Sequence, residues 1–73
     1  MSDPEFPNNT EAERAFLGSV LLAPEIFNDF SSFINPEDFY LRRHRHIWEV
    51  MRNLIEEGMH IDYLTLYDGL NSK

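Results

Sequence analysis

The chain has 73 residues, of which 42% are hydrophobic and 14% aromatic, and it carries a formal net charge of −7 with no cysteine. This length allows one small domain of marginal stability, and the apolar content predicts a folded core instead of disorder. The negative charge disfavours direct nucleic-acid binding, the missing cysteines exclude disulfides, and no apolar run reaches the roughly 20 residues that span a membrane.

Residues 1–6 have the composition of an expression scar, because Asp3-Pro4-Glu5-Phe6 is what two adjacent restriction sites encode when read through. A natural N-terminal extension is the alternative. We therefore assign the globular subdomain to residues 7–73. The chain stops shortly after its last predicted helix, and both ends lead us to expect a piece of a longer protein.

The first predicted helix covers residues 10–23. Thr10 is its expected N-cap, and Glu13 stands where a capping box needs a carboxylate. Gly18 costs a helix about 1 kcal/mol relative to alanine, so we expect a neighbouring helix to approach it closely. The apolar face of this helix is formed by Phe16, Leu17, Val20 and Leu21.

The second predicted helix covers residues 24–34, with Pro24 in its first turn. Asn35 is the expected cap of a new helical turn that begins at Pro36, and the sequence leaves open whether this turn continues into the next helix. The apolar face of the second helix is formed by Ile26, Phe27, Phe30, Phe33 and Ile34.

The third predicted helix, residues 41–57, has the clearest amphipathic pattern, and Gly58 supplies the left-handed cap that ends it. Its apolar arc is formed by Leu41, His44, Ile47, Trp48, Val50, Met51, Leu54 and Ile55.

Asp62 is the expected N-cap of a last helix, residues 63–71, which should bury Leu66, Leu70 and one of two tyrosines, Tyr63 or Tyr67. No alternating strand pattern occurs. The sequence therefore predicts an all-α fold, a small orthogonal bundle of about four helices. The residues expected in its core are Leu17, Val20, Leu21, Phe30, Phe39, His44, Ile47, Met51, Leu54, Leu66 and Leu70.

No pattern in the sequence predicts catalysis. His44 and His46 lie two residues apart on a helix and so point to different faces, while His60 lies in a loop. A metallo-enzyme would need His44, His60 and a carboxylate to converge and would contain bound metal. A buried structural His44 is the simpler interpretation. Glu56 and Glu57 are adjacent and do not face each other, and no glycine-rich phosphate-binding motif is present.

Four of the six basic residues lie between positions 42 and 52, and three of them stand near a helix N-terminus, where cations oppose the helix dipole. One interpretation is a basic patch for an acidic protein partner or a neighbouring subunit. The other is a solvated face with internal pairs, Arg45 with Glu49 and Arg52 with Glu56.

Two tyrosines are predicted to stay exposed as aromatic anchors of the kind common at protein interfaces. Together with the arginines they define a candidate partner surface that consists of Tyr40, Arg42, Arg43, Arg45 and Tyr67.

An ordered series of short segments resembles the N-terminal domain of DnaB-type replicative helicases. The resemblance covers nearly everything after residue 8, and no single segment is specific by itself. Its segments are Glu11-Ala12-Glu13, Leu17-Gly18-Ser19-Val20-Leu21-Leu22, Pro36-Glu37-Asp38-Phe39-Tyr40, His44, Ile47, Leu54, Glu57-Gly58, Ile61-Asp62, Thr65-Leu66 and Leu70.

The resemblance implies an all-α module at the head of a hexameric, ATP-driven DNA helicase in the cytoplasm of a bacterium or a phage-infected cell. It implies contacts with other subunits, primase and helicase loader, and no catalytic residue, metal or cofactor here. ATP and magnesium would bind a separate motor domain with a Walker motif.

Two departures from the family pattern matter. The chain ends before the family's helical hairpin, which puts dimerisation and primase binding in doubt, and His60 stands where proline is common. The alternative to this family is an unrelated helical adaptor, such as the helicase-binding end of a primase.

Overall fold

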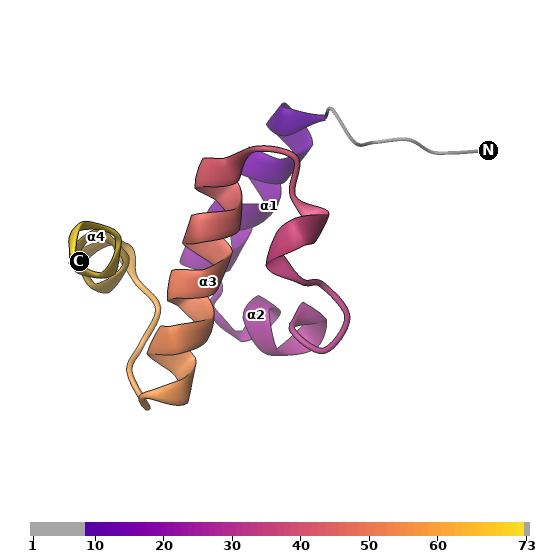
Figure 1. Ribbon diagram of the computed structural model, residues 1–73. Coiled ribbons are helices and arrows are strands. Elements are labelled where there is room, and N and C mark those ends of the chain that lie inside the picture. Colours follow the sequence, from indigo (N-terminus) through magenta and orange to yellow (C-terminus); the bar gives the residue numbers. More distant parts are fainter. Residues whose placement is uncertain (1–8, 73) are drawn as a thin grey trace.

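The computed structural model describes residues 9–72, in which four α-helices and one short 3-10 helix occur and no strand is found. The elements are α1 (Thr10–Leu22), α2 (Glu25–Phe30), η1 (Pro36–Asp38), α3 (Arg42–Glu56) and α4 (Tyr63–Asn71) (Figure 1). The prediction of an all-α bundle of about four helices is therefore confirmed. The predicted scar, residues 1–6, lies outside the described residues.

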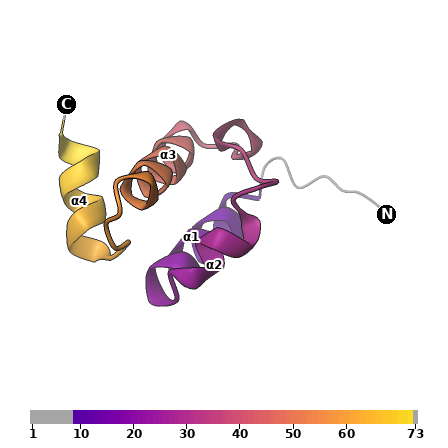
Figure 2. The same cartoon turned by 90° about the horizontal axis from the view of Figure 1, so that it is seen from below.

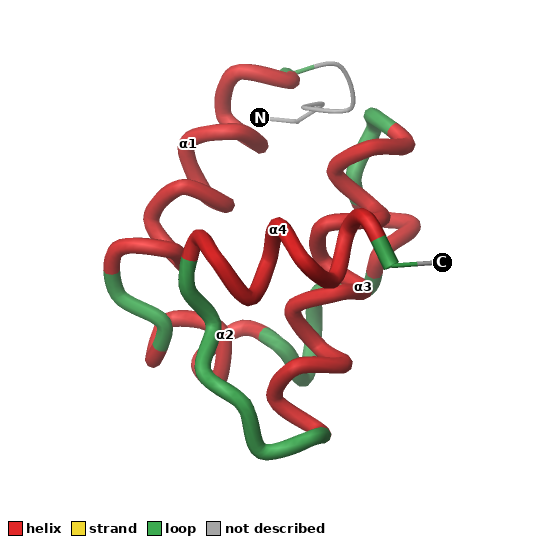
Figure 3. The backbone as a smooth tube through the Cα atoms, turned by 90° about the vertical axis from the view of Figure 1, so that its left-hand side faces the viewer, coloured by secondary structure: helices red, strands yellow, loops and turns green. Residues whose placement is uncertain are grey.

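Helix α3 is the centre of the bundle. It contacts α1 and η1 on one side and α4 on the other, while α2 packs against α1. Figure 2 shows this order, with α4 outside α3 and the α1–α2 pair opposite it. Seen from the side, α4 runs across α1 and α3 instead of lying parallel to them (Figure 3). The long amphipathic helix thus joins the N-terminal and C-terminal parts of the chain.

Trp48 lies at the centre of the core and is fully buried. Its ring centroid is 4.5 Å from that of Phe27 and 5.7 Å from those of Phe16 and Phe39. Its indole N–H donates a 3.0 Å hydrogen bond to the carbonyl of Ile34. One side chain therefore ties three segments of the chain to α3, through apolar contacts and one satisfied polar group.

The structure places most of the predicted core residues inside. Leu17, Val20, Phe39, His44, Met51, Leu54 and Leu66 are buried, whereas Leu21, Phe30, Ile47 and Leu70 are half-buried at the margin of the core. The buried set also includes Phe27, Trp48, Val50 and Ile61.

The start of α1 differs from the prediction. Asn9, not Thr10, is the N-cap, and its side-chain oxygen accepts a 3.0 Å hydrogen bond from the backbone N–H of Ala12. Thr10 is the first helical residue, and Glu13 is one position too late to complete a capping box. Asparagine caps a helix at least as well as threonine, so the helix begins one residue earlier and the Glu13 carboxylate is released for another contact.

Helix α2 ends four residues before the predicted boundary. After Phe30 the chain continues in tight turns, and both Phe33 and Ile34 donate backbone hydrogen bonds to the carbonyl of Phe30. Phe33 is consequently 63% exposed, not part of the apolar face. The residue before a proline avoids helical geometry, so Asn35 is extended and starts η1, which ends before α3 begins.

The ends of α3 and α4 are closed by local hydrogen bonds. Gly58 has a φ of +77°, and the N–H groups of Gly58 and Met59 donate to the carbonyls of Ile55 and Leu54, which is the Schellman pattern. Asp62 caps α4: its carboxylate accepts from the N–H of Thr65, whose hydroxyl accepts from the N–H of Asp62. These caps fix the turn that carries α4 back onto α3.

Two helical glycines have opposite surroundings. A Cβ at Gly69 on α4 would lie 2.5 Å from a methyl group of Val50 on α3, which is closer than real atoms approach. A Cβ at Gly18 on α1 would meet nothing within 4 Å. The close helix approach that the sequence predicted at Gly18 therefore occurs at Gly69, and no other part of residues 9–72 covers Gly18 closely.

Alanine substitutions at these glycines should change stability in opposite directions. Gly69→Ala is expected to lower the free energy of unfolding by about 1–3 kcal/mol, since α4 must move off Val50. Gly18→Ala is expected to raise it by up to about 1 kcal/mol, because alanine favours the helix and meets no obstacle. Urea denaturation followed by circular dichroism checks both, and a loss of stability in Gly18→Ala would contradict the open surroundings described here.

Candidate partner-binding surface

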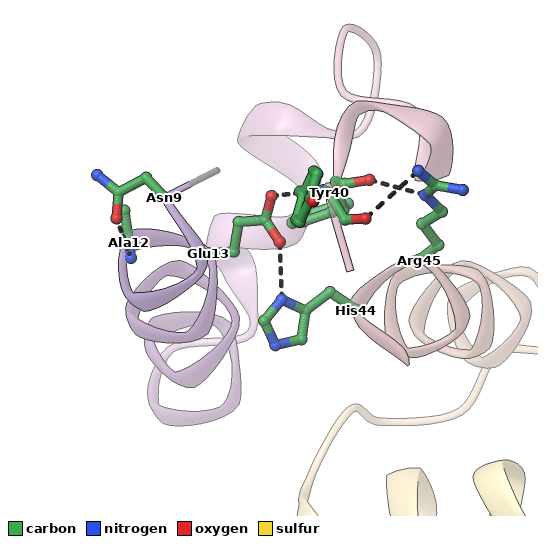
Figure 4. A network of polar contacts seen from close by, with 7 residues as sticks. Asn9, Ala12, Glu13, Tyr40, His44 and Arg45 are labelled. Atoms are coloured by element: carbon green, nitrogen blue, oxygen red, sulfur yellow. Dashed lines mark hydrogen bonds and ion pairs between the residues drawn. The ribbon is translucent and has the colours of Figure 1, made fainter. Parts of the chain in front are cut away.

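A buried polar contact joins α1 to the start of α3. One carboxylate oxygen of Glu13 accepts a 2.6 Å hydrogen bond from the backbone N–H of Tyr40, and the other lies 2.8 Å from Nδ1 of His44 (Figure 4). The two side chains are only 13% and 7% exposed. Because an ionised carboxylate only accepts hydrogen bonds, the Nδ1 of His44 must carry the proton. Glu13 thus holds the segment before α3 against α1.

The surroundings of Glu13 change its pKa in opposing ways. Burial by itself raises the pKa of this carboxyl, but the hydrogen bond from the Tyr40 N–H, the contact with His44, the N–H of Leu41 and the charge of His44 together lower it. The net result is a pKa below the ordinary value of glutamate. Glu13 is therefore ionised at neutral pH.

Arg45 is engaged within the chain. Its Nε donates a 2.7 Å hydrogen bond to the carbonyl of Phe39, and a terminal nitrogen lies 3.4 Å from the carbonyl of Tyr40 (Figure 4). Arg52 likewise donates to the carbonyl of Ile34 at 3.3 Å. The internal pairs with Glu49 and Glu56, which were one of the two interpretations of the basic cluster, do not form among residues 9–72, because these guanidinium groups bind backbone carbonyls instead.

Charge reversal at Arg45 and at Arg42 should have different effects on stability. Arg45→Glu is expected to lower the free energy of unfolding by about 1–2 kcal/mol, since it removes a charge-assisted hydrogen bond and leaves the Phe39 carbonyl without this donor. Arg42→Glu places an acid in the first turn of α3 and should change stability by no more than about 0.5 kcal/mol. Thermal unfolding of both variants checks this, and equal losses would show that the Arg45 contacts contribute nothing.

The N-terminal half of α3 forms an open basic hollow on the surface. Its lining consists of Arg42, Arg43, Arg45, His46 and Glu49. The exposed Tyr40 precedes this helix by two residues and is 53% exposed. Four members of the candidate partner surface, Tyr40 and the three arginines, therefore lie near one end of α3.

Tyr67 belongs to a second exposed area, on α4. Tyr63, Leu64 and Tyr67 are 77%, 68% and 58% exposed, and we call these three residues the α4 patch. The prediction that Tyr63 or Tyr67 is buried is wrong, because Leu66 alone is buried on this helix and Leu70 is half-buried. The apolar residues of α4 occupy a wider arc of the helix than one neighbouring helix can cover. This feature of the sequence could have predicted that Tyr63 and Leu64 are exposed.

The histidines do not converge. His44 is buried against Glu13, whereas His46 and His60 are exposed. Among residues 9–72, no group of three or more histidine, cysteine or acidic side chains could hold a metal ion. No helix in this part of the chain is long and apolar enough to cross a membrane.

The sequence is similar to one family of known proteins. A family model described as the DnaB-like helicase N terminal domain matches residues 5–73. The chain is 39% identical over 67 residues to a replicative DNA helicase DnaB of Pasteurella multocida, covering 92% of this chain and 14% of that protein. It is 36% identical over 69 residues to a replicative DNA helicase DnaB of Buchnera aphidicola subsp. Baizongia pistaciae, covering 94% and 15%.

A third relative gives a similar result. The replicative DNA helicase DnaC of Bacillus subtilis is 37% identical over 64 residues, covering 88% of this chain and 14% of that protein. The chain therefore spans about one seventh of the length of the curated relatives it matches. No solved structure matches it.

Proposed function

The chain belongs to the family of DnaB-like helicase N-terminal domains, and we propose that it is the non-catalytic protein-interaction module of a hexameric, ATP-dependent replicative helicase. In this role it supports assembly of the helicase ring and contacts primase or the helicase loader during DNA replication. ATP and magnesium bind the motor part of the longer protein, which acts in the bacterial cytoplasm. Because the chain belongs to this family, the alternative hypothesis of an unrelated helical adaptor is excluded.

The observation that carries this proposal is the α4 patch. Tyr63, Leu64 and Tyr67 expose more than half of their surface in a chain with a net charge of −7. Exposed aromatic and leucine side chains side by side on one helix are typical of protein–protein contacts, in which tyrosine combines apolar area with one hydrogen-bonding group. The same acidic charge disfavours DNA as the ligand of this surface.

Binding measurements with a double variant of the α4 patch test the proposal. We expect the chain to bind primase, the helicase loader or further helicase subunits, and Tyr63→Ser with Tyr67→Ser to weaken this binding at least about tenfold. Phe33→Ser is the matched control, because Phe33 is also an aromatic residue that is 63% exposed but belongs to the turns after α2. Isothermal titration calorimetry gives the affinities, and circular dichroism verifies that each variant is folded.

Two results would contradict the proposal. One is the absence of binding to all three kinds of protein. The other is equal weakening by the α4 variants and by Phe33→Ser, which would assign no special role to the α4 patch.

A further inference from the structure

An apolar groove lies where α1, α3 and α4 meet, and none of the three residues of the α4 patch is among its lining residues. It has a volume of about 320 Å³ and is open to solvent on one side. The groove is lined by Leu17, Gly18, Leu21, Ile47, Met51 and Leu66, with Arg14, Arg43 and His44 completing the wall. Met51 and Leu17 form a buried floor, whereas Leu21 and Ile47 are half-buried and so still present apolar surface to the groove.

Gly18 is the first indication that another molecule occupies this groove. A glycine inside a helix reduces helix stability, and close packing of a neighbouring segment is one way to compensate for the loss. Within residues 9–72 there is no such contact, since a Cβ at Gly18 would meet nothing within 4 Å. The small residue instead leaves space in the wall of the groove, where the backbone of a partner can approach α1.

The charges around the groove are the second indication. Arg14 and Arg43 stand in its wall, and no acidic side chain is among its lining residues. Arg43 has no hydrogen-bond or ion-pair partner within residues 9–72, and Arg14 has only an exposed pair with Glu11 at 3.8 Å. Arg43 also belongs to the lining of the basic hollow on α3. In a chain of net charge −7, this combination of apolar floor and arginine wall is locally selective for negative charge.

We propose that the groove binds an amphipathic helix of a partner protein, with acidic side chains at the end of that helix that reaches Arg14 and Arg43. The apolar side of the partner helix lies on Leu17, Leu21 and Leu66, and its backbone passes over Gly18. Interaxial distances of packed helices are 8–10 Å depending on the side chains at the contact, and a glycine at the crossing point permits an approach at the short end of this range. This inference rests on the proposed function and names the chemistry of the partner and the place where it binds.

Residues on the same helices provide matched variants for the test. Gly18→Leu fills the groove, and Ser19→Leu adds the same side chain at the next position, which is exposed and outside the lining. Arg43→Glu reverses a charge in the wall, and Asn53→Glu places the same acidic side chain at an exposed position of the same helix, outside the linings of the groove and of the basic hollow. All four variants alter exposed or half-buried positions, and circular dichroism melting verifies that they fold.

Calorimetry of the four variants with primase and with the helicase loader tests whether the groove is the binding site. For the protein that uses the groove, we expect Gly18→Leu and Arg43→Glu to raise Kd at least about tenfold, while Ser19→Leu and Asn53→Glu change it less than about threefold.

Other outcomes overturn the inference and are distinguishable from failure of the proposed function. If the two variants of each matched pair had equal effects, and the Tyr63 and Tyr67 double variant still lost binding, the groove would not be the binding site and the proposed function would stand.

Two results would assign the groove to another ligand. If a single-stranded oligonucleotide bound, and Arg43→Glu abolished this binding while Gly18→Leu left it unchanged, the site would bind nucleic acid. A fall in the mass of a self-associated chain in Gly18→Leu, without an effect on partners, would assign it to a second copy. Absence of any protein ligand would refute both proposals.

Discussion

Trp48→Ala is expected to lower the free energy of unfolding by about 3–5 kcal/mol, because it removes a fully buried aromatic side chain and leaves a cavity among three phenylalanine rings. A domain of this size has a total stability of roughly 4–11 kcal/mol, so the variant should be close to unfolded at 25 °C. The loss has a second source, since the Ile34 carbonyl loses its indole donor. Urea denaturation followed by circular dichroism measures the change.

Two further substitutions separate the causes. Trp48→Phe keeps most of the apolar contact and removes the hydrogen bond. It should therefore lower the free energy of unfolding less than Trp48→Ala does, but more than a substitution on the surface. Phe33→Ala removes an aromatic side chain that is 63% exposed and should change stability by less than about 0.5 kcal/mol. If Trp48→Ala and Phe33→Ala were equally mild, Trp48 would not be the centre of the core.

Glu13→Ala is expected to lower the free energy of unfolding by about 2–4 kcal/mol at neutral pH, since it leaves the buried His44 ring and the Tyr40 N–H without their acceptor. The intact chain should also lose stability in acid. The pKa of Glu13 is lower in the folded state than in the unfolded state, so the unfolded chain takes up this proton more readily. The contribution of Glu13 is thus complete above the unfolded pKa of about 4.3 and is lost as the pH falls through the folded pKa.

Glu13→Gln isolates this pH dependence. The amide has nearly the same shape and keeps one acceptor oxygen, but it does not titrate. Its stability should therefore fall less steeply than that of the intact chain between about pH 5 and pH 3. Denaturation curves collected across this range make the comparison. Parallel pH profiles for the two proteins would show that the Glu13 carboxylate has no special interaction in the folded state.

Local patterns in the sequence were sufficient to predict most of the helical elements. The 3.6-residue periodicity identified α3, and the chemistry of Gly58 and Asp62 located its end and the start of α4, because these signals depend only on neighbouring residues. The errors have physical reasons. Asn9 and Thr10 are both good caps, so the sequence could not choose between them. The end of α2 was predicted too late, because the turns between Phe30 and Pro36 end the helix and the helical periodicity of the sequence does not show them.

Contacts between distant residues could not be predicted. Glu13 fitted a capping box by spacing, yet its partners are Tyr40 and His44, which are 27 and 31 residues away. The helical periodicity could not show which glycine faces a neighbouring helix, and the structure assigns this role to Gly69 instead of Gly18. The sequence predicted a partner surface from the presence of arginines alone. The structure shows that their environments differ, because Arg45 donates a hydrogen bond to a backbone carbonyl and Arg43 lines the groove.

The proposed role of this domain is to bind other proteins of the replication machinery. The most direct test is a titration of the isotopically labelled chain with primase and with the helicase loader, followed by amide chemical shifts in NMR spectra. At least one of them is expected to shift amides of α4 around Tyr63 to Tyr67 and of α1 around Gly18, while α2 is unaffected. Unchanged spectra with both proteins, together with a mass that stays monomeric at all concentrations, would refute this role.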